Sequence, residues 1–367
     1  MSRPVGFEPE HERWMRRALA LAARGRGLAS PNPLVGAVVV KDGVVVGEGY
    51  HRYDRVRHAE VIALEQAGER AAGADLYVTL EPCCHTGRTP PCVDAIIRAQ
   101  VRRVFVATRD PNPQVQGRGV AELRRHGVEV RVGLLQEEAA SLNRPFFFAM
   151  EHHRPWVTLK LAMTLDGCIA AWDGSSRWIT GELSRRSVHR LRFEADAVLV
   201  GVGTVLVDDP SLDVRGVRRK RILKVILDSN LRIPSEARLF SSQDPVLIFH
   251  GPDVAGSERR RLAGRADLVG VRRLRGGLDW RRILEELDRR QIRHLLIEGG
   301  SRVATSLLAQ VRPLELVLFF APKLLGAEGV HGIGSLGKRT LADAPILEDM
   351  SVRRSGEDFV VRGLLRE

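Results

Sequence analysis

The chain has 367 residues, of which 44% are hydrophobic and 28% charged, and its formal net charge is +12. Because a single hydrophobic core stops growing at roughly 250 to 300 residues, this length predicts two globular domains. No window approaches the ~20 apolar residues of a membrane span, and residues 1–17 lack an apolar signal core. The composition therefore argues against a membrane protein, and we expect a cytoplasmic one.

The positive charge would suit a nucleic-acid partner, because phosphate backbones attract basic surfaces. The excess is spread over both halves of the chain, however, and no basic tail is present. Aromatic residues make up only 5%, whereas single-strand binders present aromatic stacking platforms. We expect no nucleic-acid partner. The local cluster Arg215–Arg221 is either a solvated loop that joins two strands or an anion site.

The first half of the chain alternates between helical and strand patterns. We predict helices over residues 10–25, 58–68, 92–99 and 119–126, a strand pair over 35–46 that turns at Asp42-Gly43, and strands over 76–79, 103–107 and 128–132. Such alternation is typical of a three-layer α/β/α domain.

One histidine and two spaced cysteines in this half have the chemistry of a zinc site. His58 and Glu60 begin a predicted helix, Cys83 follows a predicted strand, and Cys92 begins the next helix. Three protein ligands leave zinc one open position, where a bound water becomes acidic and nucleophilic. Base deaminases combine H-x-E with P-C-x-x-C and use the glutamate as a proton shuttle. We predict His58, Cys83 and Cys92 as ligands and Glu60 as the catalytic acid–base.

Two alternatives remain open for this segment. An H-x-E sequence is by itself an ordinary helix start, and Cys83, Cys84, His85 and Cys92 could form a four-ligand structural zinc site. The structural site would leave His58 and Glu60 without a role. Cys84 should face away from the metal, because adjacent residues of an extended chain point to opposite sides. Three of the four cysteines lie in this loop, which suits a reducing compartment, and we expect Cys168 to be buried without a function.

The second half also alternates, after a short packed connector over residues 146–155. We predict strands over 156–162, 197–200, 224–227, 246–249 and 295–297, and helices over 182–193, 280–290 and from about 302 onward. The last strand leads into Gly299-Gly300-Ser301, and a glycine turn before a helix directs free backbone N–H groups toward an anion. The turn lacks the full G-x-G-x-x-G spacing, so a plain strand-to-helix turn is the alternative.

Seven segments together resemble the bifunctional riboflavin-biosynthesis deaminase-reductase family, and the likeness covers nearly the whole chain. The segments are Ser30–Gly36, His58–Glu60, Cys83–Cys92, Leu159–Gly167, Ser176–Thr180, Gly203–Pro210 and Glu298–Gly300. The resemblance implies a cytidine-deaminase-like domain over residues 1–144 and a dihydrofolate-reductase-like α/β domain over residues 145–367.

The resemblance also implies two consecutive reactions on small phosphoribosyl-pyrimidines. The first domain would use one Zn²⁺ to deaminate 2,5-diamino-6-ribosylamino-4(3H)-pyrimidinone 5′-phosphate. The second would use NADPH to reduce the ribosyl group of 5-amino-6-(5-phosphoribosylamino)uracil to ribityl. Two other classes stay open: a nucleobase or tRNA deaminase with a non-catalytic C-terminal domain, and a zinc-stapled nucleic-acid-binding protein. By analogy we expect a homo-oligomer that assembles through the second domain.

The same resemblance implies the remaining site residues. Those for NADPH are Ala162, Trp178, Thr204, Asp208, Ser229, Gly300, Ser301, Arg302, Val303, Ala304, Thr305 and Ser306. Those for substrate are Asn32, His85 and Arg88 in the first domain and Ser176, Arg192, Leu212, Arg215 and Glu298 in the second. Considered alone, Asn32 could cap a turn, Trp178 could be a core aromatic, and Asp208 could cap a strand end. Lys160 and Asp166 receive no role.

Overall fold

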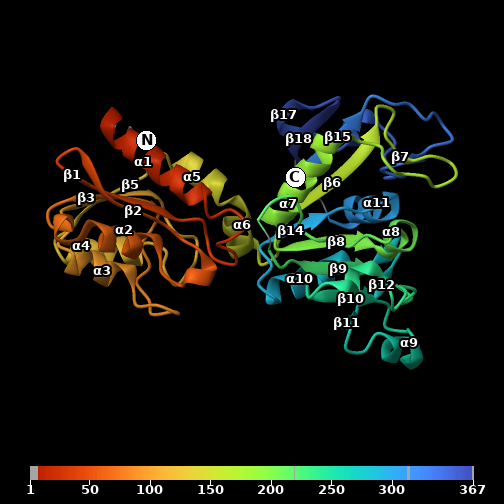
Figure 1. The fold of residues 1–367 in the computed structure, drawn as a ribbon, viewed down its shortest axis with the longest axis horizontal. Helices are drawn as coiled ribbons and strands as arrows, with labels where there is room; N and C mark the ends of the chain where they lie inside the picture. The colour runs from red at the N-terminus through yellow and green to blue at the C-terminus, as the bar shows by residue number, and fades with distance from the viewer. Residues whose placement is uncertain (1–6, 219, 312–314, 366–367) are drawn as a thin grey trace. The chain divides into compact units, whose positions relative to one another are not determined.

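The computed structural model describes residues 7–218, 220–311 and 315–365. The chain forms two compact units, Met1–His153 and Arg154–Glu367. Both units alternate helices and strands (Figure 1). The expected boundary at residues 144 and 145 falls at the start of helix α6, Arg144–His152, which belongs to the first unit. The division of activities at that boundary stays a prediction.

The first unit has, among its described residues, a five-stranded sheet in the order β2-β1-β3-β4-β5. Strands β3, β4 and β5 are parallel, and β1 is antiparallel to both β2 and β3. The strands are β1 Gly36–Lys41, β2 Val44–Tyr50, β3 Asp75–Leu80, β4 Arg103–Thr108 and β5 Glu129–Val132. The helices are α1 Pro9–Ala23, α2 Ala59–Ala67, α3 Cys92–Arg98, α4 Arg118–Arg125 and α5 Gln136–Leu142, besides α6.

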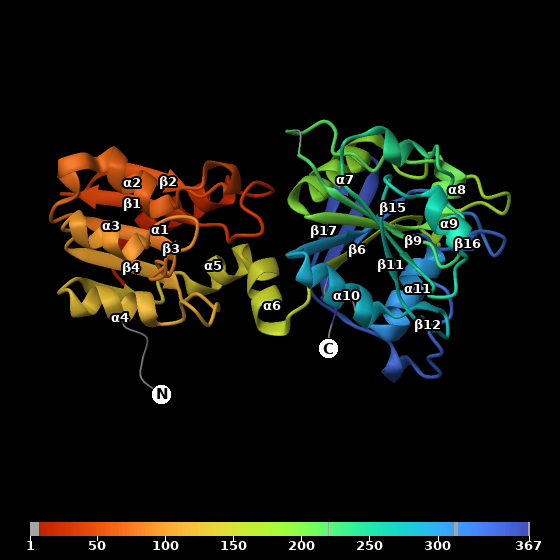
Figure 2. The same ribbon diagram turned by 90° about the horizontal axis from the view of Figure 1, so that it is seen from below.

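The helices of this unit cover both faces of the sheet, as the predicted three layers require (Figures 1 and 2). Helices α1 and α5 share a core cluster with Val38, Tyr77 and Phe105 on one face. Helices α2, α3 and α4 share another with Val39 and Val78 on the opposite face. The alternation of side chains along each strand supplies both cores.

Two glycines of β2 bring the ligand-bearing helix α2 against the sheet. A Cβ at Gly47 would lie 2.0 Å from the Ala63 carbonyl oxygen, and one at Gly49 would lie 2.2 Å from that of Ala59. Because no side chain fits there, the strand and the helix backbone touch directly. This contact fixes the depth at which the start of α2 sits on the sheet.

The second unit has, in the part of the chain that the structure describes, a nine-stranded sheet ordered β11-β10-β9-β8-β14-β6-β15-β18-β17. Strands β11 through β15 in this order are parallel, and β18 and β17 complete the edge as an antiparallel pair. The strands are β6 Trp156–Thr164, β8 Ala197–Gly201, β9 Leu223–Leu227, β10 Val246–His250, β11 Asp267–Gly270, β14 His294–Ile297, β15 Glu315–Ala321, β17 Leu347–Ser355 and β18 Asp358–Leu365.

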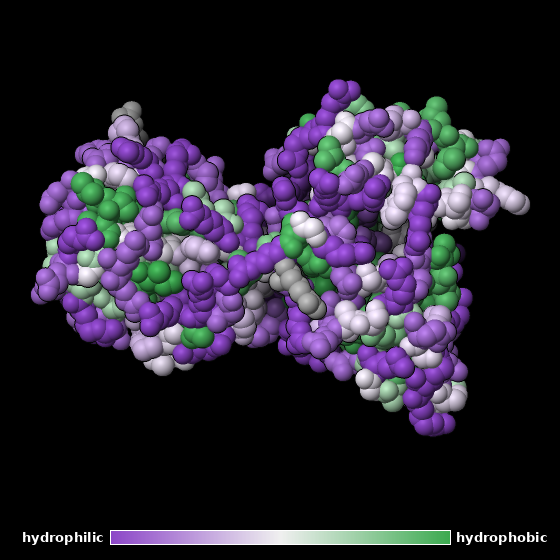
Figure 3. All heavy atoms as spheres, in the orientation of Figure 1, coloured by the Kyte–Doolittle hydropathy of each residue, from purple (hydrophilic) through white to green (hydrophobic). Residues whose placement is uncertain are grey.

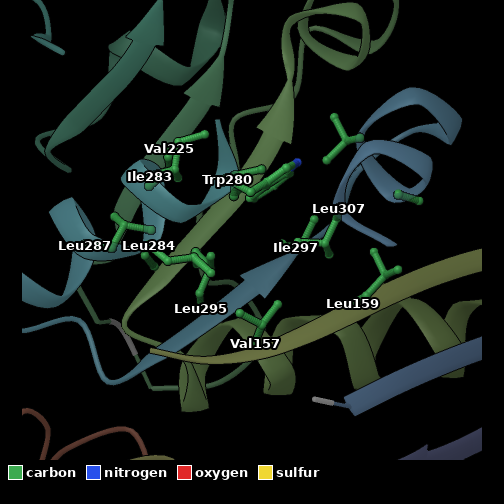
Figure 4. Packing of buried hydrophobic residues seen from close by; sticks show 14 of the residues in the cluster. Val157, Leu159, Val225, Trp280, Ile283, Leu284, Leu287, Leu295, Ile297 and Leu307 are labelled. Carbon is green, nitrogen blue, oxygen red and sulfur yellow. The ribbon is translucent and has the colours of Figure 1, made fainter. Parts of the chain in front are cut away.

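Helices cover this sheet, and the described residues of the unit also form two small two-stranded sheets. The helices are α7 Glu182–Glu194, α8 Val202–Asp208, α9 Gly256–Arg261, α10 Trp280–Arg289 and α11 Ser301–Gln310. One pairs β7 Cys168–Ala170 with β16 Val330–His331, and the other is the hairpin of β12 Arg273–Leu274 with β13 Gly277–Leu278. Figure 4 shows the main core, where Trp280 and Leu284 of α10 and Leu307 of α11 pack with Leu295 and Ile297 of β14.

The predicted elements are present, and the structure adds others. The expected connector after Asn143 is the helix α6, and the pattern analysis also missed α5, α8 and the strands β15, β17 and β18. Short helices carry little periodicity, and the preference of a segment for a strand depends on the side chains packed against it, so tertiary contacts rather than local preference stabilise these elements. Figure 3 shows a mostly hydrophilic face with separate apolar patches. No helix within the described residues combines the length and apolarity needed to cross a bilayer.

Candidate active sites

His58, Cys83 and Cys92 come together in the first unit. Their ligand atoms all lie within 4.8 Å of one another. His58 Nδ1 is 3.1 Å from Cys92 Sγ and 3.4 Å from Cys83 Sγ, which is close to the about 3.5 Å between ligand atoms of a tetrahedral zinc. The donor set and its spacing therefore fit a Zn²⁺ with three protein ligands.

These three side chains lie at junctions between secondary-structure elements. His58 immediately precedes α2, Cys92 is the first residue of α3, and Cys83 follows β3. The Cys92 N–H donates to Cys83 Sγ at 3.3 Å. Helix N-termini stabilise negative charge, so the start of α3 favours a thiolate at Cys83, whose sulfur accepts this N–H.

The pKa shifts of the side chains in this site favour metal binding and proton transfer. A hydrogen bond from the Cys92 thiol lowers the pKa of Cys83 to about 4, and a hydrogen bond with Cys83 raises the pKa of His58. Glu60 is 4% exposed, and burial raises the pKa of its carboxyl group. A carboxyl group whose pKa is moved toward neutrality can both accept and release a proton during catalysis.

The buried Glu81 fixes the segment that leads into the loop from Cys83 to Cys92. The Glu81 carboxylate accepts the N–H groups of Gly117 and Val120, each at 3.0 Å, so it holds the start of α4. A Cβ at Gly119 would lie 2.0 Å from the Pro82 carbonyl oxygen, which leaves no room for a side chain. The residue before Cys83 is thus clamped against the α4 backbone.

Asn32 is linked to the candidate metal site by His51, a histidine that the sequence analysis did not identify. His51 Nδ1 donates to the Arg57 carbonyl oxygen at 3.0 Å, so its Nε2 accepts from Asn32 Nδ2 at 3.0 Å. The His51 ring stands edge-on to that of His58, with the centroids 5.3 Å apart. Burial lowers the pKa of His51, which favours this neutral form. The Asn32 amide is therefore oriented beside the ligand shell, and nothing in its sequence context marks His51.

The loop from Cys83 to Cys92 also contains Arg88, His85 and Cys84. The Arg88 guanidinium lies 4.7 Å above the ring of Tyr53, two residues after His51. His85 Nδ1 is buried without a hydrogen-bond partner among the described residues. The Cys84 thiol lies outside the ligand cluster and faces the Gln114 carbonyl oxygen at 3.8 Å, as expected of a residue that points away from the metal. The four-ligand structural site is therefore not formed.

The second unit gathers its predicted residues at one edge of the sheet. The carboxyl ends of the parallel strands β14, β8 and β9 lead into Gly300, Thr204 and Ser229. A Cβ at Gly300 would lie 3.7 Å from Thr204 Oγ1, so the two turns are neighbours. Ligands of open α/β sheets bind outside the carboxyl ends of the strands. The predicted strand–glycine–helix turn is present, with α11 starting at Ser301.

Most of the α11 residues predicted for the cofactor have buried side chains or hydrogen bonds within the protein. Val303 and Ala304 are buried in the core, so only their backbone can face a ligand. The Thr305 hydroxyl donates to the Ser301 carbonyl oxygen at 2.7 Å and accepts the Gly334 N–H at 2.7 Å. Ser306 accepts the Trp280 indole N–H at 3.0 Å and donates to the Val303 carbonyl oxygen at 3.1 Å. Arg302 is exposed.

Arg192, Glu298 and Lys160 form a nearly enclosed charge cluster. The Arg192 fork grips both oxygens of Glu298 and donates from Nη1 to the Asp213 carbonyl oxygen at 3.0 Å. Lys160 Nζ lies 4.0 Å from Glu298. Burial lowers the pKa of Lys160, and Arg192 keeps the pKa of Glu298 low in spite of burial. In this structure the Arg192 fork is bonded to Glu298, and its expected contact with phosphate stays a prediction.

Trp178 and Asp208 differ from their single-residue interpretations. Trp178 is 64% exposed, with the Arg185 guanidinium 4.5 Å from its ring, so it is not a core aromatic. Asp208 is the last residue of α8 rather than a strand-end cap, and it accepts the Ser176 hydroxyl at 3.3 Å. Ala162 lies two residues before the end of β6 and is partly buried.

The loop that follows α8 carries Leu212 and Arg215. The Leu212 side chain is buried in the core, so only its backbone can face a ligand. The Arg215 N–H donates to His189 Nδ1 at 3.2 Å, and its guanidinium donates to Ser211 at 3.1 Å. The segment Arg215–Arg221 joins a helix to a strand, not two strands as expected, and Arg219 lies outside the described residues.

Asp166 and Cys168 have structural contacts. Asp166 accepts the N–H groups of Leu325 at 2.8 Å and Gly326 at 2.6 Å. The Thr164 hydroxyl and these two bonds lower the pKa of Asp166 to about 2. Asp166 therefore anchors the loop after β15. Cys168 is fully buried, as expected.

Two family comparisons divide the chain in the same way as the two sites. The RibD C-terminal domain family matches residues 155–361, and the family of the cytidine and deoxycytidylate deaminase zinc-binding region matches residues 8–108. The riboflavin biosynthesis protein RibD of Aquifex aeolicus (strain VF5) is 47% identical over 350 residues, which cover 95% of this chain and 96% of that protein.

The chain belongs to the RibD family.

Further RibD proteins agree in sequence and in fold. RibD of Escherichia coli (strain K12) is 42% identical over 95% of this chain and 98% of its own. The solved Acinetobacter baumannii RibD, form 1, superimposes with a TM-score of 0.90 at 36% identity, covering 98% of this chain and 99% of that one. A Thermotoga maritima structure, titled a diaminohydroxyphosphoribosylaminopyrimidine deaminase/5-amino-6-(5-phosphoribosylamino)uracil reductase, gives 0.87 at 37% identity, covering 97% and 99%. These matches confirm the predicted fold class.

Proposed function

We propose that this chain is a bifunctional enzyme of riboflavin biosynthesis that first deaminates a phosphoribosyl-diaminopyrimidine and then reduces its ribosyl group to ribityl. The observation that carries the proposal is the His58–Cys83–Cys92 cluster with Glu60 beside it, in a chain whose residues 155–361 also match the RibD C-terminal domain family. We assign the first reaction to residues 1–144 and the second to residues 145–367.

In the first site, His58 Nδ1 and the two thiolates would hold zinc, which acidifies a water in its open position. Glu60 would take the proton of the attacking water and deliver it to the ring nitrogen and then to the leaving amine. Asn32, oriented by His51, would bind the pyrimidine edge. Arg88 and His85 would meet the ribose phosphate, and the unpartnered Nδ1 of His85 supports that role.

In the second site, NADPH would supply a hydride to C1′ of the sugar. The turn Gly299–Ser301 would bind its pyrophosphate with backbone N–H groups, and Thr204, Asp208, Ser229, Ala162 and Trp178 would line the rest of the cofactor. Glu298 would hold the substrate, with Arg192 fixing its carboxylate and Lys160 adding a positive charge. Ser176, Leu212 and Arg215 would complete the substrate site at the neighbouring loops.

The decisive experiment is a coupled assay with the purified chain. We expect ammonia release from the diaminopyrimidine substrate, and NADPH oxidation that requires the deaminated product. A nucleobase or tRNA deaminase with an inert second domain would instead release ammonia without any NADPH oxidation. Absence of both activities in zinc-loaded protein would contradict the proposal. That the chain does not bind nucleic acid stays a prediction, which salt-dependent binding measurements can test.

We further propose that the chain is a homo-oligomer through the second unit. Strand β17 forms an edge of the nine-stranded sheet, and Met350 and Val352 on it are 59% and 61% exposed. Exposed apolar edge strands favour pairing with another chain. We expect Val352→Glu to lower the molecular mass seen by sedimentation to that of a monomer, whereas Arg353→Glu on the opposite face leaves it unchanged. An unaltered mass for Val352→Glu would contradict this interface.

A further inference from the structure

Arg273 ties together the loops that follow β9 and β10. Its Nε donates to Asp253 Oδ1 at 2.9 Å, and its Nη2 donates to the Ser229 carbonyl oxygen at 2.7 Å and to Asn230 Oδ1 at 2.8 Å. A Cβ at Gly251 would lie 2.5 Å from the guanidinium carbon, so the group lies flat against the backbone there. The guanidinium is therefore held in one orientation at the carboxyl ends of both strands.

Part of this guanidinium remains available. A guanidinium has five N–H donors, and the three bonds described use Nε and both hydrogens of Nη2. Nη1 has no hydrogen-bond partner among residues 7–218, 220–311 and 315–365, and neither has the Ser229 hydroxyl. Two charged donors and one hydroxyl thus lie at the same strand end, fixed and unused.

The position of these groups fits one end of a dinucleotide. Strands β14, β8, β9 and β10 are parallel neighbours in this order, so the end of β9 lies two strands, about 10 Å, from the glycine turn after β14. A Cβ at Gly277, in the hairpin that carries Arg273, would lie 3.7 Å from Ser306 of α11. Trp280 also bonds to Ser306, so the hairpin is anchored on the helix whose N-terminus faces the proposed pyrophosphate.

We propose that Arg273, together with the Ser229 hydroxyl, binds the 2′-phosphate of NADPH and makes the second site selective for NADPH over NADH. This inference rests on the proposed function of the second unit. The 2′-phosphate alone distinguishes the two dinucleotides, and a guanidinium suits it because paired N–H groups match phosphate oxygens. The ion pair with Asp253 occupies Nε, so Nη1 is left for the phosphate.

The test is equilibrium binding to the full chain, without turnover. NADPH and NADH are titrated by fluorescence, and adenosine 2′,5′-bisphosphate and 5′-AMP by calorimetry. Loss of a charge-assisted hydrogen bond predicts that Arg273→Gln weakens NADPH and the bisphosphate about ten- to a hundredfold, while NADH and 5′-AMP change less than about twofold. Arg282→Gln, which removes an exposed arginine paired with Glu285, serves as the matched control and should change neither ligand.

A second variant covers the case in which Arg273→Gln disturbs the loops. Ser229→Ala removes the hydroxyl but keeps the carbonyl oxygen that Arg273 holds, and we expect it to lower the NADPH-to-NADH affinity ratio about fivefold. An unchanged ratio in both variants, or equal weakening of all four ligands, overturns the inference while NADPH binding by the wild type upholds the reductase. A wild type that binds neither dinucleotide overturns both.

Discussion

Glu60→Gln is expected to reduce deamination by about 10²- to 10⁴-fold while the protein keeps its zinc. Glutamine preserves the shape of a side chain that is 4% exposed, but it cannot carry the proton between water, ring nitrogen and leaving amine. The three ligand atoms are untouched, because none of them belongs to Glu60. Ammonia release measures the activity, and elemental analysis measures the zinc.

The same helix offers a control for this substitution. Glu65 lies on α2 with its side chain 51% exposed and pairs with Arg57, so Glu65→Gln should leave both zinc content and deamination unchanged. The reduction of supplied deaminated product should also persist in Glu60→Gln. Loss of zinc from Glu60→Gln would show that the carboxylate maintains the site rather than moving protons, and would contradict the assigned role.

Arg192→Ala is expected to impair reduction strongly and to leave deamination within about twofold of the wild type. The substitution removes both bonds to Glu298 and the bond to the Asp213 carbonyl oxygen. Breaking a buried ion pair typically destabilises a protein by about 3–5 kcal/mol, because the remaining charge is left without compensation. We therefore expect the kcat/KM of the reductase to fall at least about a hundredfold, together with a lower unfolding temperature of the second unit.

Arg192→Lys separates positioning from folding. Lysine keeps a positive charge beside Glu298 but cannot hold both carboxylate oxygens in a planar fork. We expect this variant to retain most of the stability and still lose about tenfold in reductase kcat/KM. Full reductase activity in Arg192→Lys would show that the orientation of Glu298 by the fork is not needed. Loss of deamination in either variant would contradict the division into two independent sites.

The two sites use different kinds of groups. The first gathers side chains at helix and strand ends, where hydrogen bonds shift the pKa values of Cys83 and His58 and burial raises the pKa of Glu60. The second relies on backbone N–H groups of a glycine turn and on one enclosed charge cluster. This contrast follows from the chemistry proposed for each: proton transfer needs titratable groups, whereas transfer from a bound cofactor needs placement.

Parts of the second site depended on contacts that no local pattern encodes. Arg192 and Glu298 are 106 positions apart, and Arg273 meets Ser229 across 44 positions, so only the folded sheet brings each pair together. Trp178 looks like a core residue in sequence because most isolated tryptophans are buried, yet its loop leaves it exposed. His51 becomes recognisable only when its ring is seen between Asn32 and His58.

The sequence by itself determined the two-part α/β organisation, the candidate metal ligands and the glycine turn. These features are local, because hydrophobic periodicity, ligand chemistry and a strand–glycine–helix pattern are each written in short segments. The tertiary structure alone decided which hydroxyls of α11 are already used, that Arg192 grips Glu298, and where Arg273 lies. The physical reason is that hydrogen bonds and ion pairs depend on distances of about 3 Å, which are set by packing between segments remote in the chain.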